Sequence, residues 1–270
     1  MPLTAIQRSA ADVLRPYRSA HSYVAGGAAL NRGWPRLSDY MDIFHDRGDR
    51  LPDSVGPEFE ALRNAGFAVE RIAETDLVVE AIVSRGGAET RIQWFHDEET
   101  CRRFFPALED PDFGFRLHDA DAAVNKVLCA ARRKSAARDA VDLAAVVERY
   151  APLGPLVWAA GAKAPDLAPP ATLRAIRATV FGYSREEVET VRMADGSATD
   201  WRHLRAVLDR ALDAASEFCE FTAPMAYPGC LFVDADDTPV EADDASIGAG
   251  TAFAANIRDY SGIPVIEAGL

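Results

Sequence analysis

The stretch Val24-Ala25-Gly26-Gly27-Ala28-Ala29-Leu30 decides the fold that we expect for this chain. Residues 22–25 fit a short buried strand, and the double glycine separates that strand from a helix that begins at Ala28. Glycines at such a turn let the backbone come close to a phosphate, whose charge the backbone N–H groups and the helix N-terminus favour. A glycine pair is also a common tight turn, so the pair alone leaves both interpretations open.

A strand with acidic side chains, residues 39–45, is expected about twelve residues after the double glycine, within Arg36-Leu37-Ser38-Asp39-Tyr40-Met41-Asp42-Ile43-Phe44. Side chains two apart on a strand lie on one face. A carboxylate pair at positions 40 and 42 would therefore hold one or two Mg²⁺ ions against a triphosphate. Here position 42 is Asp42, but position 40 is Tyr40.

The carboxylates of this strand need partners. Asp39 points away from position 40 in a regular strand, and a bulge would be needed to bring it round. Asp42 lies between Met41 and Ile43 on a strand that we expect to be half buried. A carboxylate without a partner is costly there, which predicts a metal, an Arg or a Lys beside Asp42.

The bulk composition limits the classes of partner. The 270 residues are long enough for one large domain or two modest ones, and the net charge of −13 argues against a broad surface for duplex nucleic acid. Basic residues form one dense cluster, which fits either a solvated helix end or a local basic groove: Arg132, Arg133, Lys134 and Arg138.

The cysteines and the apolar segments bear on the compartment. Cys101, Cys129, Cys219 and Cys230 lack C-x-x-C spacing, which favours reduced core thiols over a zinc site. No apolar run approaches the length of a membrane span, and no signal peptide is recognisable. We therefore expect a cytoplasmic protein.

The pattern of apolar residues predicts an α+β chain in three parts. Residues 1–118 read as a small mixed sheet with helices on one face, 119–229 as a helical region, and 230–270 as a terminal hairpin and a weakly patterned tail. In the first part we expect helices at 4–18 and 57–65, the latter after a polar break at 47–57, and strands at 22–25, 39–45, 67–72, 77–84 and 90–96. Arg85-Gly86-Gly87-Ala88 indicates a hairpin between the last two strands. In the rest we expect helices at 120–131, 136–150, 171–178, 184–190 and 200–221, a linker at 163–170, and a hairpin at 230–240.

Two of the expected helices carry charged residues among apolar neighbours. Lys126 either extends its ammonium group to solvent or meets a buried anion, of which a phosphate is one example. Asp139 and Asp142 are three residues apart and share a helix face. Asp139 lies near the start of its helix, where capping or the helix dipole offers a purely structural explanation.

Together these motifs resemble the AbiEii-type nucleotidyltransferases, toxin-like members of the DNA polymerase β superfamily found in bacterial toxin–antitoxin and phage-defence systems. The resemblance covers residues 20–150. Its motifs are Gly26-Gly27-x-Ala-Leu30, Arg36-x-Ser38-x-x-x-Asp42-Ile43-Phe44, Asn125-Lys126-Val127-Leu128 and Arg138-Asp139-x-x-Asp142-Leu143.

The resemblance implies transfer of a nucleoside monophosphate from an NTP, with Mg²⁺, to an RNA or other hydroxyl acceptor, tRNA included. A cognate antitoxin is an implied partner. The implied roles are triphosphate contact for Gly26 and Gly27, metal binding for Asp42, phosphate contact for Lys126, membership of the catalytic set for Asp139, orientation for Asp142, and shaping of the nucleotide-binding loop for Arg36 and Ser38.

This sequence departs from the family pattern at three positions. Tyr40 replaces the first metal carboxylate, Ala28 stands where Ser or Thr is frequent, and Gln93 stands where a third carboxylate is frequent. Glu80, on the neighbouring strand, would supply a compensating carboxylate if its strand turns it to the same face. The number of Mg²⁺ ions that the site would hold, two or only one, stays open. The alternative is a catalytically degenerate member that binds a nucleotide or a partner protein, with Tyr40 as a stacking platform for a base as one further role.

Overall fold

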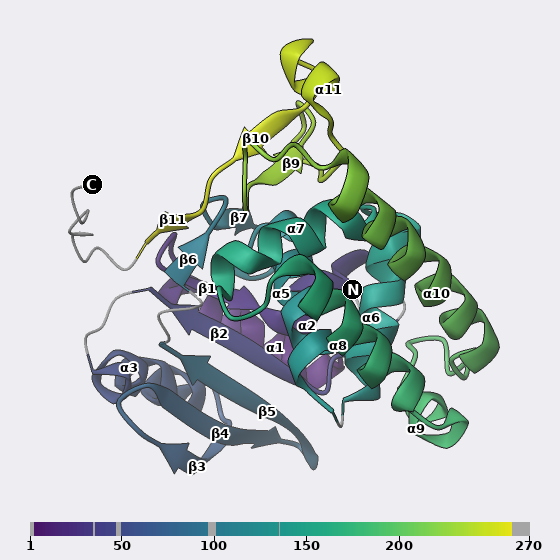
Figure 1. Cartoon of the computed structure of the whole chain (residues 1–270). Helices are drawn as coiled ribbons and strands as arrows, with labels where there is room; N and C mark the ends of the chain where they lie inside the picture. The colour runs from purple at the N-terminus through teal and green to yellow at the C-terminus, as the bar shows by residue number, and fades with distance from the viewer. Residues whose placement is uncertain (1–2, 35, 47–49, 97–100, 135, 261–270) are drawn as a thin grey trace. The chain divides into compact units, whose positions relative to one another are not determined.

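A mixed sheet of seven strands forms the centre of the first of two structural units (Figure 1). The structure, a computed structural model, describes residues 3–34, 36–46, 50–96, 101–134 and 136–260. One unit comprises Met1–Arg32, Leu37–His118 and Arg258–Leu270, and the other comprises Gly33–Arg36 and Asp119–Ile257. Sheet and helices together confirm the predicted α+β class.

The strand order in the sheet is β3-β4-β5-β2-β1-β8-β7. The pairs β2–β5 and β1–β8 are parallel, and the other neighbours are antiparallel. The strands are β1 (Ser22–Ala25), β2 (Tyr40–His45), β3 (Ala68–Glu74), β4 (Val78–Arg85), β5 (Ala88–Phe95), β7 (Leu108–Asp110) and β8 (Gly114–Arg116). The predicted hairpin joins β4 to β5, and its turn uses the positive φ angles of Gly86 (62°) and Gly87 (81°).

Helices α1 (Ala5–Leu14) and α3 (Leu51–Asn64) cover one face of this sheet. Alternate side chains of β2 and β5 enter the same apolar core as these helices, among them Met41, Ile43 and Trp94. The intervening side chains of both strands point to the opposite face, where they are half-exposed or exposed.

Helix α3 begins earlier than the sequence pattern predicts. We expected its start at residue 57, but the helix begins at Leu51, with Pro57 inside it. Leu51, Val55 and Phe59 are all buried, so burial of this stripe outweighs the backbone hydrogen bond that Pro57 cannot make. Of the predicted break at 47–57, residues 47–49 lie outside the described part of the chain.

Short strands after residue 101 were not predicted. These are β6 (Arg102–Arg103), β7 and β8, each of two or three residues, which is too short to show a period. Gly114 opens β8 at φ 82°, and a Cβ there would lie 2.6 Å from the Arg15 carbonyl oxygen. The edge hairpin therefore depends on the absence of a side chain at this position.

The second unit is mainly helical. Its long helices are α5 (Asp119–Arg132), α6 (Ala137–Arg149), α7 (Leu153–Lys163), α8 (Pro169–Gly182) and α10 (Trp201–Glu217), and α9 (Arg185–Glu189) is short. The prediction omitted α7, which is buried on nearly every side and so lacks an amphipathic period. Lys163 at its end donates to Asp121 (2.7 Å) and Asn125 (2.8 Å) of α5. No helix within the described residues has the length and apolar character needed to cross a membrane.

The first strand of the expected C-terminal hairpin pairs with a strand farther along the chain than predicted. The expected turn is present, with Asp237 at φ 58° and the Asp234 carboxylate accepting from the N–H groups of Asp236 and Thr238. However, β9 (Leu231–Val233) pairs mainly with β10 (Phe253–Ala255), beyond a short helix α11 (Asp244–Gly248). Farther on, β11 (Arg258–Asp259) pairs with β6 in the first unit.

Candidate functional site

One row of polar side chains crosses the sheet of the first unit. The strand register pairs Asp42 of β2 with Gln93 of β5, and Gln93 with Glu80 of β4. Paired residues on neighbouring strands point to the same face. These three side chains therefore share the face opposite α1 and α3, and Tyr40, two residues before Asp42, lies on it as well.

The turn after β1 lies directly against Asp42. Strand β1 leads without a loop into α2 (Gly26–Leu30), and Gly26 adopts φ 59°, a left-handed conformation. A Cβ at Gly26 would lie 1.9 Å from the Asp42 carboxylate oxygen Oδ2. Only glycine thus lets the start of α2 and the Asp42 carboxylate occupy this place together.

Two hydrogen bonds hold the chain as it enters β2. The Gln7 side-chain amide of α1 donates to the Ser38 carbonyl oxygen (2.9 Å), and the Ser38 hydroxyl donates to the Tyr40 carbonyl oxygen (2.6 Å). Ser38 is therefore part of the support for the strand that carries Asp42. At the other end of α2, the Asn31 amide donates to the Gly27 carbonyl oxygen (2.9 Å).

The other acidic candidates are less well placed. Glu80 is on the shared face, but its carboxylate pairs with Arg91 (3.0 Å), and its strand is two strand spacings, roughly 10 Å, from β2. Asp39 is exposed and precedes β2. The register of β2 on β5 runs without a shift from Tyr40 to Phe44, so no bulge brings Asp39 to the Asp42 face.

Few oxygen donors surround Asp42 in the part of the chain that the structure describes. Within the described residues, no group of three or more His, Cys, Asp or Glu side chains is placed to hold a metal. Mg²⁺ is commonly bound through one or two carboxylates plus substrate phosphates and water. Asp42 and Gln93, paired across β2 and β5, offer one carboxylate and one neutral amide oxygen on this sheet face.

In the second unit, Lys126 lies within a buried ion network made of Arg36, Lys126, Asp139 and Asp142. The Lys126 ammonium is 2.7 Å from Asp139 Oδ1 and 2.9 Å from Asp142 Oδ2. Arg36 donates to both oxygens of Asp142, at 2.5 and 3.0 Å. The two aspartates thus share a helix face as predicted, and Asp139 accepts from Lys126 with no capping bond from its side chain to α6.

Two members of the network, Lys126 and Asp142, have pKa values that favour their charged forms although both are buried. Burial lowers the pKa of Lys126, but the negative charges of Asp142 and Asp139 raise it by more than burial lowers it. The pKa of Lys126 therefore lies above its usual value. Burial likewise raises the pKa of Asp142, and Lys126 and Arg36 outweigh that effect and hold it below its usual value. The Asp139 oxygen Oδ2 is buried without a hydrogen bond, and Arg133 Nη1 lies 3.9 Å from it.

Sequence reasoning missed a tyrosine that holds the turn between α5 and α6. The Tyr183 hydroxyl accepts from the Ala136 N–H (3.1 Å) and donates to the Arg133 carbonyl oxygen (3.1 Å). It follows α8 in the chain, and nothing in the spacing of its neighbours signals this contact. The basic cluster of the turn is partly engaged, since Arg132 pairs with Asp166 at the surface.

Among solved structures, the chain is similar to MenT4, a nucleotidyltransferase toxin from Mycobacterium tuberculosis H37Rv. The sequences are 18% identical, and the match covers 78% of this chain and 91% of that chain with a TM-score of 0.43. No family model and no curated protein matches. A likeness at this level says nothing of what this chain acts on.

The first prediction concerns Gly26. We expect Gly87→Ala, at an open hairpin position with φ 81°, to cost about 1–2 kcal/mol of unfolding free energy through its left-handed backbone. Gly26→Ala bears the same backbone cost and also forces the Asp42 carboxylate or α2 to move, so it should cost clearly more. Urea unfolding of both variants measures the difference. Equal losses would show that Gly26 and Asp42 are not in close contact.

The second prediction concerns Asp142. Asp142→Asn leaves two buried cations with one carboxylate, so we expect the unfolding free energy at pH 7 to fall by about 3–5 kcal/mol. Because the folded-state pKa of Asp142 is lowered, its contribution is full above about pH 4 and is lost as the pH falls through the folded-state value. The difference in unfolding free energy between the wild type and Asp142→Asn should therefore become smaller as the pH falls below about 4.

The matched control is Asp166→Asn, which breaks the exposed pair with Arg132 and should cost about 1 kcal/mol or less. Urea unfolding at several pH values gives all three curves. An Asp142→Asn protein as stable as the control at pH 7 would refute the role of the buried ion network.

Proposed function

We propose that this chain is a nucleotidyltransferase that moves a nucleoside monophosphate from an NTP to an RNA or other hydroxyl acceptor, with RNA as the acceptor considered below. The observation that carries the proposal is the position of the Asp42 carboxylate, which lies against the Gly26 backbone at the start of α2 and beside Gln93 on one sheet face. Backbone N–H groups at a helix start favour phosphate, and a carboxylate beside them suits a cation that accompanies it.

Asp42 and the Gln93 amide oxygen would hold one Mg²⁺ ion, and Gly26 and Gly27 would contact the triphosphate. When bound, the ion offsets negative charge on the phosphate oxygens. The acceptor oxygen then forms a bond to the α-phosphorus as the bond from that phosphorus to the β-phosphate bridging oxygen breaks, and pyrophosphate leaves. Positioning and electrostatics supply most of the catalysis in reactions of this kind.

For Lys126 and Asp139 of the second unit we propose the roles that the family resemblance implies, phosphate contact and membership of the catalytic set. An ammonium group has three N–H donors, and Asp139 and Asp142 take two of them, which leaves one for a phosphate oxygen. Asp139 Oδ2 makes no hydrogen bond within the described residues and is proposed to take the proton of the acceptor hydroxyl. Asp142 and Arg36 would hold both groups in place.

The acceptor and the biological setting follow from the family resemblance alone. tRNA is the proposed acceptor class, and a role as the toxin of a toxin–antitoxin pair, with a cognate antitoxin as partner, is proposed with it. Both are separable from the chemistry, since an NTP-dependent transfer can be measured on bulk RNA without any partner protein.

A second candidate function is nucleotide binding without catalysis. It is favoured by Tyr40 and Gln93, which leave Asp42 as the carboxylate nearest the start of α2, while Glu80 is paired with Arg91. In that case Tyr40 would serve as a stacking platform for the base. A nucleotide that raises the melting temperature equally with and without Mg²⁺ would support this candidate.

The third prediction separates the two functions. Transfer of α-labelled NTP into bulk tRNA with Mg²⁺ should fall about 100-fold or more in Asp42→Asn, since a group that stabilises transition-state charge is lost. Tyr40→Asp restores a second carboxylate on the same face and should raise the rate. Glu89→Gln, an exposed position at the start of β5, serves as the matched control and should leave the rate unchanged.

Two outcomes would contradict the proposal. Equal rates in the wild type and Asp42→Asn would show that Asp42 holds no catalytic ion. No transfer by either the wild type or Tyr40→Asp with all four NTPs, together with Mg²⁺-independent stabilisation by a nucleotide, would establish the degenerate binder instead.

A further inference from the structure

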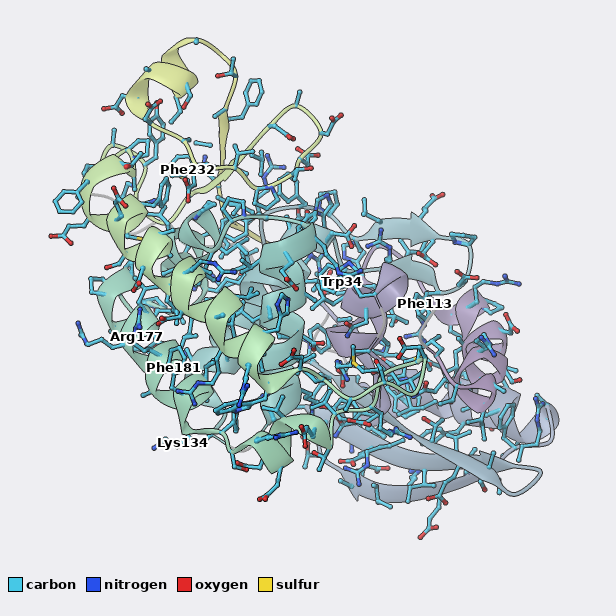
Figure 2. The ribbon with its side chains drawn as sticks, turned by 90° about the vertical axis from the view of Figure 1, so that its right-hand side faces the viewer. Trp34, Phe113, Lys134, Arg177, Phe181 and Phe232 are labelled. Carbon is cyan, nitrogen blue, oxygen red and sulfur yellow. The ribbon has the colours of Figure 1, made fainter. Side chains whose placement is uncertain are left out.

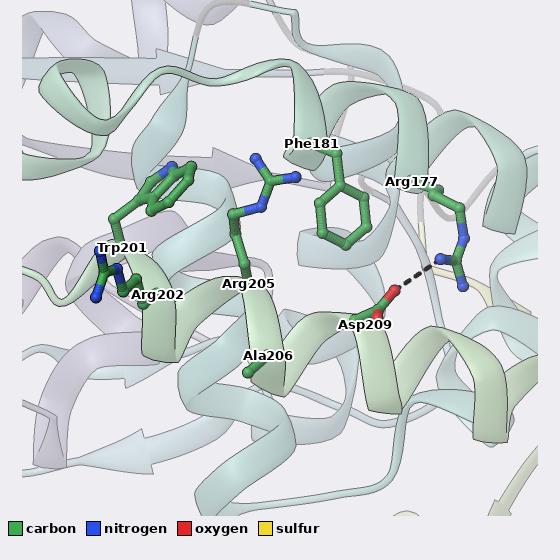
Figure 3. A pocket seen from close by; sticks show the side chains of 7 residues that line it. All are labelled: Arg177, Phe181, Trp201, Arg202, Arg205, Ala206 and Asp209. Carbon is green, nitrogen blue, oxygen red and sulfur yellow. Dashed lines mark hydrogen bonds and ion pairs between the residues drawn. The ribbon is translucent and has the colours of Figure 1, made fainter.

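A pocket of about 560 Å³ lies between α8 and α10 in the second unit and takes no part in the proposed chemistry (Figures 2 and 3). Two aromatic rings line it, Phe181 of α8 and Trp201 of α10, together with Arg202 and Arg205 of α10. Figure 3 shows the Arg205 side chain between the two rings. This combination of flat apolar surface and positive charge is unusual in a chain of net charge −13.

The two rings hold the Arg205 guanidinium in place. Its central carbon is 4.7 Å from the centroid of the Phe181 ring and 4.8 Å from that of Trp201. Trp201 and Arg205 are four residues apart on α10 and so share a helix face. A guanidinium beside aromatic rings keeps N–H groups with which it can bind an oxyanion in the bidentate manner.

Arg202 and Arg205 form no salt bridge within the described part of the chain. Hydrogen bonds from the His203 and Arg202 N–H groups, and after them the charge of Arg202, help to lower the pKa of the nearby Asp200 carboxyl. Arg177, at the edge of the pocket, pairs with Asp209 (2.8 Å) and Asp213 (2.5 Å). Neither Arg202 nor Arg205 has such a carboxylate partner among the described residues. The pocket therefore offers two cationic donors beside aromatic surface.

A nucleotide unit matches these features better than other anions. An acidic peptide segment would engage the two guanidinium groups but leave the rings unused, and an inorganic phosphate would do the same. A nucleotide within a single strand supplies both a phosphate and a base whose flat face stacks on an aromatic or guanidinium plane. In a duplex the bases are stacked on one another and are not available to the pocket.

We propose that this arginine–aromatic pocket, formed by Phe181, Trp201, Arg202 and Arg205, binds single-stranded RNA. The base of one nucleotide stacks on the side of an aromatic ring that Arg205 does not cover, and the flanking phosphates contact Arg202 and Arg205. The inference deepens the proposed function, on which it rests for the choice of RNA as the nucleic acid, and it assigns the acceptor strand a docking place of its own.

The fourth prediction tests binding alone, with the full chain, a fluorescently labelled 12-nucleotide single-stranded RNA, and neither NTP nor Mg²⁺. If the pocket neutralises two phosphates, the logarithm of the association constant should change with the logarithm of the salt concentration with a slope of about −1.4. In Arg205→Ala or Arg202→Ala, which keep one such contact, the slope should be only about −0.7. Loss of the stack in Arg205→Ala should also weaken binding about tenfold. Arg205→Lys should keep the wild-type slope but lose affinity, because an ammonium does not stack as a guanidinium does.

The matched control is Arg210→Ala, which removes the same charge from an exposed position of α10 outside the pocket. It should keep the wild-type affinity and salt slope. Equal affinities for the Arg202, Arg205 and Arg210 variants, no RNA binding by the wild type at low salt, or binding of a polyglutamate peptide in place of RNA would each overturn the proposal. Since Arg202 is exposed, its variant tests the pocket even if Arg205→Ala fails to fold.

The same variants separate this inference from the proposed function. If RNA binding depends on Arg202 and Arg205 but the chain transfers no nucleotide, the RNA-binding proposal is supported and the nucleotidyltransferase proposal is contradicted. If both variants transfer nucleotide to RNA with an unchanged KM for RNA, the nucleotidyltransferase proposal is supported and the RNA-binding role of the pocket is contradicted.

Discussion

The close approach of the Gly26 backbone to the Asp42 carboxylate is the constraint on which the candidate site depends. It requires a strand that ends at glycine, a helix that begins there without a loop, and an antiparallel neighbour whose register pairs Ala25 with Asp42. Each of these features brings N–H groups and a carboxylate to one face of the sheet. The opposite face packs against α1 and α3 in the apolar core, so the proposed chemistry is assigned to this face.

Both units hold charge in their interiors by pairing it. In the first unit Arg18 pairs with Glu58, which also accepts from the Trp94 indole (2.8 Å), and Arg103 pairs with Asp46 (2.5 Å). The second unit uses the buried ion network around Lys126 in the same way. Arg202, which is exposed, and Arg205, which is half-buried beside two aromatic rings, differ from these residues because neither forms a salt bridge among the described residues. A buried ion pair is by itself weak evidence for stability, but removal of one partner leaves an uncompensated buried charge.

The sequence was sufficient for elements with a clear period or a strong turn, such as β1, β2 and the Gly86-Gly87 hairpin. It also placed Asp139 and Asp142 on one helix face, because three-residue spacing fixes that. It was insufficient where partners are remote in the chain. The row from Asp42 through Gln93 to Glu80 exists because β2 pairs in parallel with β5, and no local pattern encodes that register. Helix α7 escaped prediction because burial on nearly every side removes the amphipathic signal.

The most direct test of the central claim is Mn²⁺ binding, followed by electron paramagnetic resonance with a non-hydrolysable NTP analogue. In the proposed reaction, Asp42 and Gln93 share one ion with the triphosphate. Mn²⁺ should therefore bind tightly at one ion per chain only when the analogue is present, and Asp42→Asn should abolish that binding. Analogue binding that is equally tight without Mn²⁺ and unaffected by Asp42→Asn would contradict the account.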